Sequence, residues 1–209
     1  MLRSIVLLFA LVSAMPALAQ APGTLAPRVR FETSLGDFVV ELDTVRAPLT
    51  AENFLRYVRD GAYDGTVFHR VIAHFVVQGG GYDERLAERP ARAPIPNESG
   101  NGLSNRRGSL GLAREESPHS GSSQFYINLL DNAALDPRPN RWGYAVFGNV
   151  VEGMDVVDRL GYLPTETVES FGADVPVQKP VVRRAYVVDA STSATPPQPP
   201  KEEKADETK

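Results

Sequence analysis

The most regular pattern in this chain is a short-range alternation of apolar and polar positions. In residues 36–43, Phe38, Val40 and Leu42 recur with a period of two, which is typical of a β-strand. Similar runs, rich in β-branched and aromatic residues, recur along the chain. The strands predicted in this way cover residues 28–33, 36–43, 66–71, 75–79, 109–113, 124–129, 144–150 and 181–188.

Two segments favour helices. In residues 48–60, Phe54, Tyr57 and Val58 form an apolar stripe at helical spacing. Thr50 is a candidate N-cap for this helix, and Gly61 is its stop signal. A second, short helix is predicted over 154–160.

The order of these elements indicates the fold class. Strands and helices do not alternate regularly, which argues against a doubly wound parallel sheet. Many short strands with few helices favour an antiparallel barrel or sandwich. The long stretch 82–107 shows no clear period, and we expect it to form a surface loop.

Both ends of the chain are expected to lie outside this domain. Residues 1–19 resemble a secretory signal peptide, because Arg3 precedes an apolar run at 5–12 and Ala-Leu-Ala at 17–19 fits a cleavage site. A membrane anchor is the alternative interpretation. Residues 20–27 are then a short N-terminal extension, and residues 28–189 form the folded domain. The tail, 190–209, combines prolines and charges with little apolar surface, so we expect it to be disordered.

Composition excludes several classes of function. The chain of 209 residues has 22 Lys and Arg, 26 Asp and Glu, and no cysteine. Disulfides and thiolate metal sites are therefore impossible. A net charge of −4 without a basic block makes nucleic acid and anionic membrane surfaces poor candidates as partners.

Other catalytic constellations are weak. Among the three histidines, His69 and His74 are five positions apart, which places them on opposite faces of a regular strand. The serines at 122 and 123 lie in GSSQF, which lacks the second glycine of the G-x-S-x-G motif of hydrolases.

The most informative stretch is VFHRVIAHFVVQGGG, residues 67–81. It sets Arg70 and Gln78 into apolar, β-branched sequence that ends in glycines. Even-numbered positions of a strand share one face, so Arg70 and Gln78 are expected to point the same way, with Ile72 and Val76 between them. Because a lone buried guanidinium is costly, Arg70 either serves a polar site beside an apolar pocket or lies on the surface of an edge strand.

This stretch and two further blocks carry a resemblance to a known family. Taken in order, FHRVI with VQGGG, SSQFYIN, and YAVFGNVVEGMDVVDRL resemble the cyclophilin family of peptidyl-prolyl cis-trans isomerases over residues 29–188. The sequence NGLSNRRGSLGLAR, at 101–114, is similar to the bacterial branch. Together with the signal peptide, this implies an exported, periplasmic enzyme.

The resemblance implies a fold and a reaction. The fold expected is mainly β: a closed, eight-stranded antiparallel β-barrel capped by two α-helices, with substrate on its outside. The partners implied are proline-containing unfolded or partly folded polypeptides, and no cofactor or metal is required. We expect a monomer. The alternative on the same scaffold is a non-catalytic proline-binding or chaperone module.

The resemblance also implies residue roles. Arg70 is the catalytic group, and Gln78 positions it. The residues implied to bind substrate are Phe75, Val76, Ala113, Arg114, Gln124, Tyr126, Leu135 and Tyr144. Of these, Ala113 and Arg114 would hold the peptide through their backbone, and the others would form or adjoin the proline pocket. The residues themselves leave open that Phe75 and Leu135 are core, Gln78 is a satisfied strand-end side chain, and Tyr144 is an ordinary surface tyrosine.

Three positions depart from the family pattern. Ala134 stands where a large aromatic is common, so we expect weak binding of cyclosporin-like inhibitors. Tyr126 replaces the usual phenylalanine and needs a partner for its hydroxyl. Ala-His at 73–74 replaces a proline-glycine pair and is expected to alter the local strand bend.

Overall fold

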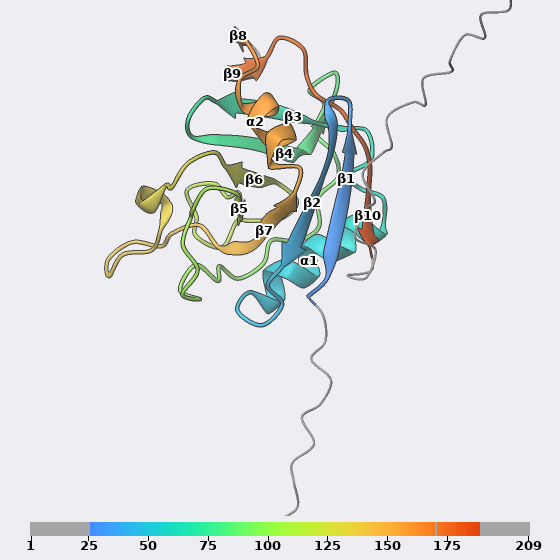
Figure 1. Cartoon of the computed structure of the whole chain (residues 1–209). Helices are drawn as coiled ribbons and strands as arrows, with labels where there is room; N and C mark the ends of the chain where they lie inside the picture. The colour runs from blue at the N-terminus through green and yellow to red at the C-terminus, as the bar shows by residue number, and fades with distance from the viewer. Residues whose placement is uncertain (1–25, 170, 189–209) are drawn as a thin grey trace, which may run out of the picture.

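The computed structural model describes residues 26–169 and 171–188. The main sheet is antiparallel and has eight strands in the order β10-β1-β2-β7-β5-β6-β4-β3 (Figure 1). Its strands are β1 (Arg28–Thr33), β2 (Gly36–Leu42), β3 (Thr66–Ile72), β4 (Val76–Asp83), β5 (Ser109–Leu112), β6 (Phe125–Asn128), β7 (Val146–Glu152) and β10 (Val182–Val188). All eight predicted strands are present, and differences are confined to their ends.

The sheet curls strongly but stays open, so the predicted closed barrel is wrong. Within the described ranges, no ladder joins its edge strands, β3 and β10; one isolated bridge connects Val67 of β3 with Val181, the residue before β10. The Phe68 N–H donates to the Pro180 carbonyl at this contact. Pro180 has no N–H to return, which stops regular pairing there. The fold is thus mainly β, with an open, curled half-barrel and two helices.

Aromatic side chains fill the inside of the curl. Phe31 and Phe38 lie on the inward face of the β1–β2 hairpin and stack at 4.9 Å between ring centroids. Phe54 and Phe125 meet edge to face at 5.5 Å. The fully buried members of this core include Phe31, Phe38, Phe54, Tyr63, Phe68, Phe125 and Phe147. Because these rings fill the interior, a substrate has to bind on the outer face of the sheet.

Helix α1 (Pro48–Arg59) closes one end of the curl, and its apolar stripe is buried as predicted. The predicted N-cap, Thr50, is wrong. Ala47 occupies the cap position without a side-chain hydrogen bond. The Glu98 carboxylate accepts hydrogen bonds from the N–H groups of Leu49 and Thr50 and from the Thr50 hydroxyl. A residue nearly fifty positions away thus caps the helix, which local sequence cannot reveal.

Glu98 belongs to the long stretch without strands between β4 and β5, so the loop predicted over 82–107 is confirmed apart from its first two residues. Helix α2 (Met154–Gly161) is also confirmed and packs near β2 and β4. A 3-10 turn, Ala133–Leu135, follows β6. Neither helix of the described ranges is long and apolar enough to cross a membrane.

A second, two-stranded sheet was not predicted. It consists of β8 (Thr165–Val168) and β9 (Gly172–Pro176), and it packs against β3 at the top of Figure 1. The predicted signal peptide 1–19, most of the extension 20–27 and the tail 190–209 lie outside the described residues.

Candidate active site

Arg70 and Gln78 face each other across two neighbouring strands. Residues 73–75 form a turn between β3 and β4, which brings Arg70 directly opposite Gln78 in the register. The expectation that they point the same way is met, but not along one strand. The predicted strands 66–71 and 75–79 left a break at this point, although neither proline nor glycine marks a turn there.

Hydrogen bonds connect these side chains. Arg70 Nη1 donates to Gln78 Oε1 at 3.4 Å, and Gln78 Nε2 donates to Gln124 Oε1 at 2.9 Å. The second bond determines which end of the Gln78 amide faces Arg70, so the oxygen accepts from the guanidinium. Gln78 therefore connects Arg70 to Gln124.

A cavity of about 210 Å³ opens beside this pair on the outer face of the sheet. Nine of the ten predicted site residues line it: Arg70, Phe75, Val76, Gln78, Ala113, Arg114, Tyr126, Leu135 and Tyr144. The tenth, Gln124, does not line the cavity and accepts a hydrogen bond from Gln78. A few polar side chains, Arg70, Gln78 and Arg114, set beside apolar and aromatic ones are the arrangement of a small-ligand site.

The floor of the cavity is the ring of Tyr126. Its hydroxyl donates to Asn105 Oδ1 at 2.6 Å, which supplies the partner that a buried tyrosine needs. Burial raises the pKa of Tyr126 well above its usual value, so the phenol stays protonated and remains a donor. Gly111 lies opposite in β5, where a Cβ would come within 2.1 Å of the ring.

One wall is held by Arg114. Its guanidinium lies 4.5 Å from the centroid of the Tyr144 ring and donates to the carbonyls of Gly143 and Trp142. Tyr144 in turn meets Tyr126 edge to face at 5.9 Å. Tyr144 is thus fixed in the wall rather than free on the surface. The Ala113 N–H already donates to the Gln124 carbonyl, so it is not available to a peptide.

These findings agree with comparisons against known proteins. The model of the cyclophilin type peptidyl-prolyl cis-trans isomerase family matches residues 28–187. The chain belongs to the cyclophilin family. It is accordingly a peptidyl-prolyl cis-trans isomerase, an enzyme of the isomerase class.

Several bacterial cyclophilins are close relatives. A peptidyl-prolyl cis-trans isomerase of Streptomyces antibioticus is 48% identical over 163 residues, which cover 77% of this chain and 98% of the relative. Peptidyl-prolyl cis-trans isomerase A of Dickeya dadantii is 40% identical over 187 residues, covering 90% and 96%. Peptidyl-prolyl cis-trans isomerase B of Escherichia coli is 42% identical over 162 residues, covering 76% and 98%.

A solved cyclophilin also shares the fold. The cyclophilin type isomerase of Cryptosporidium parvum, whose crystal structure was also determined in the presence of the dipeptide Ala-Pro, superimposes with a TM-score of 0.64 at 25% identity. The match to the structure with the dipeptide covers 78% of this chain and 99% of that one.

Two features of this cyclophilin's site were not found from the sequence. His69 is buried beside Arg70, and its ring meets Tyr82 and Phe171 edge to face. Burial lowers the pKa of His69 to about 4, with a further lowering from the Arg70 charge, so the imidazole is neutral at physiological pH. On the solvent side, Asp174 Oδ2 of β9 lies 3.8 Å from Arg70 Nε.

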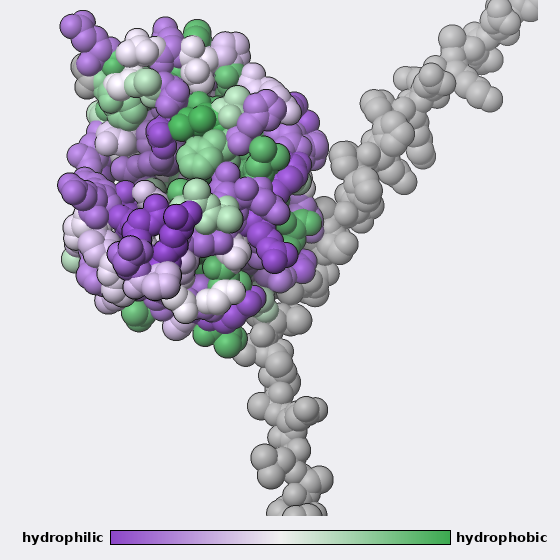
Figure 2. Space-filling model, turned by 90° about the vertical axis from the view of Figure 1, so that its left-hand side faces the viewer, coloured by the Kyte–Doolittle hydropathy of each residue, from purple (hydrophilic) through white to green (hydrophobic). Residues whose placement is uncertain are grey.

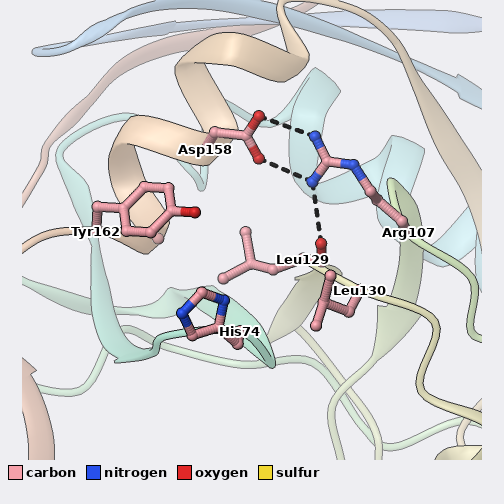
Figure 3. A pocket seen from close by; sticks show the side chains of 7 residues that line it. His74, Arg107, Leu129, Leu130, Asp158 and Tyr162 are labelled. Carbon is pink, nitrogen blue, oxygen red and sulfur yellow. Dashed lines mark hydrogen bonds and ion pairs between the residues drawn. The ribbon is translucent and has the colours of Figure 1, made fainter.

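This cyclophilin has a second, larger cavity of about 270 Å³ near the end of α2 (Figure 3). Arg107 donates two hydrogen bonds of 2.8 Å to Asp158 and one of 2.9 Å to the Leu129 carbonyl. His74 and Tyr162 meet edge to face at its rim. Arg107 and Asp158 neutralise each other. Their hydrogen bonds, together with the one to Leu129, hold α2 against the end of β6.

The remaining observations concern the rim of the first cavity, the β3–β4 turn and possible metal sites. Ala134 is exposed in the 3-10 turn, one residue before the pocket residue Leu135. His74 adopts a left-handed backbone with φ of 59° in the β3–β4 turn, a conformation that glycine adopts most readily. Within residues 26–169 and 171–188, no group of three or more His, Cys, Asp or Glu side chains is arranged to hold a metal ion.

Proposed function

We propose that Arg70 is the catalytic group of this isomerase, that Gln78 positions it, and that the enzyme acts on exported proteins. The observation that carries the proposal is the position of the Arg70 guanidinium. It lies at the rim of the apolar cavity and is linked through Gln78 to Gln124.

The reaction needs a hydrogen-bond donor and no bond cleavage. Amide resonance imposes a barrier of ~18–20 kcal/mol on X–Pro rotation. As the bond twists, the prolyl nitrogen loses conjugation and its lone pair becomes an acceptor. A donor aimed at that nitrogen therefore stabilises the transition state more than the ground state. Arg70 can donate at any physiological pH, because a guanidinium stays protonated.

The cavity suits the proline ring. We propose that Phe75, Val76, Tyr126, Leu135 and Tyr144 hold the ring while the preceding carbonyl rotates, and that backbone near Ala113 and Arg114 binds the peptide. Since the Ala113 N–H is already bonded, its carbonyl and the Arg114 N–H are the groups proposed to contact substrate. Gln124 contributes through Gln78.

Energetic considerations show that Arg70 does not act alone. A 10⁴-fold acceleration requires about 5.4 kcal/mol at 1.36 kcal/mol per tenfold. A hydrogen bond from a charged donor contributes roughly 1.5–3 kcal/mol. Orientation of the bound peptide and exclusion of water by the apolar wall have to supply the rest.

Refolding of a protein limited by a proline isomerisation tests the activity. The mature domain should accelerate refolding, and Arg70→Ala should reduce the acceleration at least tenfold without changing the melting temperature. Arg56→Ala is the matched control, because Arg56 is exposed on α1 and does not line the cavity. Full activity of Arg70→Ala would remove Arg70 from the mechanism. Peptide binding without acceleration by the wild-type domain would indicate the non-catalytic module instead.

We infer a periplasmic, monomeric enzyme. The sequence of residues 1–19 supports export, and Figure 2 supports the monomer, since the face that it shows is mainly hydrophilic with small, separated hydrophobic patches. N-terminal sequencing of the protein from a periplasmic fraction should give Gln20 as the first residue. Recovery of the uncleaved chain in the membrane fraction would favour the membrane anchor.

A further inference from the structure

The β8–β9 hairpin contains a local irregularity next to the active site. In its register, Glu166 pairs with Val175 and Val168 with Gly172, so one residue of β8 lies opposite both Ala173 and Asp174. This is a β-bulge, a device that redirects a side chain away from the regular strand alternation.

Asp174 adopts a strained conformation within this bulge. Its φ is +65°, and it is one of three non-glycine residues with positive φ in the described ranges. Aspartate tolerates this left-handed conformation better than most residues, although it still costs more than the extended form. Such strain persists only where the surroundings hold it in place, and it is concentrated near functional sites.

The hairpin is anchored firmly enough to hold the bulge. Val175, the next residue, is fully buried. Phe171 packs edge to face against His69 at 5.8 Å and against Tyr82 at 4.8 Å between ring centroids. Anchors on both sides of Asp174 therefore attach β9 to β3, the strand that carries Arg70.

The result of this arrangement is a second contact to the guanidinium. Asp174 Oδ2 lies 3.8 Å from Arg70 Nε, while Gln78 accepts from Nη1. The two contacts engage different nitrogens of the same group. The Arg70 side chain is about 41% exposed, and without a partner it could adopt many solvent-facing rotamers. Two attachment points restrict it to the rim of the cavity.

We propose that Asp174 is a positioning residue for the isomerase reaction, holding the Arg70 guanidinium from the solvent side while Gln78 holds it from the cavity side. This rests on the proposed role of Arg70. Asp174 does not touch the substrate. It increases the fraction of enzyme in which the donor already points at the prolyl nitrogen, so it acts on kcat and leaves KM unchanged.

The decisive variant is Asp174→Asn, which keeps the shape and the tolerance for positive φ but removes the charge. We expect kcat to fall about two- to fivefold, the range that an exposed ion pair supports. KM and the melting temperature should not change. Asp155→Asn is the matched control, because Asp155 forms a similar exposed ion pair with Arg159 on α2, and it should keep full activity.

Two further measurements separate positioning from a structural effect. In the Arg70→Ala background, Asp174→Asn should have no additional effect, because the group to be positioned is gone. Raising the salt concentration should lower kcat of the wild type toward that of Asp174→Asn, since exposed ion pairs are screened. The kcat of the variant should respond less to salt.

The outcomes distinguish the two proposals. If Arg70→Ala is inactive but Asp174→Asn has wild-type kcat, Arg70 keeps its role and the positioning role of Asp174 is wrong. The positioning role is also wrong if Asp174→Asn lowers kcat by the same factor in the wild type and in Arg70→Ala. It is equally wrong if Asp174→Asn changes KM alone. If Arg70→Ala is fully active, the proposed mechanism itself fails.

Discussion

The Tyr126 hydroxyl and the Asn105 side chain meet at 2.6 Å beneath the proposed proline pocket. Asn105 also donates twice to Asp136 Oδ1, from its backbone N–H and from Nδ2, each at 2.8 Å. Asp136 directly follows Leu135. One asparagine from the long loop therefore connects the floor of the pocket to its wall.

This link predicts different outcomes for its two ends. Tyr126→Phe removes one hydrogen bond, but Asn105 Oδ1 still accepts from Asn128 Nδ2 at 3.2 Å. We expect a loss of about 1 kcal/mol in the free energy of unfolding and nearly full isomerase activity. Urea unfolding and the refolding assay measure both quantities. A tenfold loss of activity would show that the hydroxyl has a role in the reaction.

Asn105→Ala should lower both stability and activity more than Tyr126→Phe does. It leaves the buried Tyr126 hydroxyl without its acceptor and releases Asp136, so we expect a loss of about 1–3 kcal/mol in stability. Because Leu135 loses its fixed position, KM should rise more than kcat falls. An unchanged KM in peptide assays would show that Leu135 is held by other contacts.

Gly111→Ala tests how tightly the Tyr126 ring, which forms the floor of the pocket, is packed. The added Cβ would lie 2.1 Å from Tyr126 Cζ, so the buried ring has to move into the cavity. We expect a loss of about 1–3 kcal/mol in stability, as for other overpacked cores, together with weaker peptide binding. Gly100→Ala is the control, since a Cβ there meets no described atom within 4 Å. Equal peptide affinity in calorimetry would contradict the prediction.

Because His69 is buried in its neutral form, we predict that the folded protein loses stability in acid. Its pKa in the folded protein is about 4, against about 6.5 for an unperturbed histidine. Between these values the unfolded chain binds a proton that the folded protein does not. The free energy of unfolding therefore falls as pH decreases from about 6.5 to about 4, and below about 4 His69 causes no further loss. At 1.36 kcal/mol per pKa unit, the loss is about 3 kcal/mol.

His69→Phe isolates this contribution, because phenylalanine fills a similar space and cannot titrate. Urea unfolding between pH 7 and pH 4 should show a shallower decline for this variant than for the wild type. Equal slopes would mean that His69 becomes protonated within the folded protein.

The Arg107–Asp158 pair should matter for stability rather than catalysis. Both side chains are partly exposed, so a double-mutant cycle to alanine should give a coupling of about 0.2–1 kcal/mol. The pair lowers the pKa of Asp158, so this coupling is present above the usual carboxyl pKa and disappears as pH falls through the lowered value. Refolding activity should remain unchanged. A loss of activity would indicate that the second cavity takes part in the reaction.

Much of the fold follows from local patterns. Alternating residues such as Phe38, Val40 and Leu42 can bury one face only as a strand, and the stripe from Phe54 to Val58 requires a helix. The site was also largely predictable, since seven of its ten predicted residues lie in three compact blocks of sequence and nine of the ten line one cavity. The strands predicted over 66–71 and 75–79 left a break between Arg70 and Gln78, but the tight turn there was not predicted, because His74 takes the left-handed conformation without the usual glycine signal.

Local sequence patterns were enough to find the eight strands of the main sheet and both helices, and to identify the chemical groups, Arg70 and the apolar residues after it, that are available to a proline. Only the tertiary structure decided that the sheet stays open beside Pro180, that Glu98 caps α1, and that Asn105 and Asp174 reach the site. Each of these depends on residues far apart in the chain. Their contacts arise when the core packs and the loops are fixed in space, so no local pattern of hydrophobicity records them.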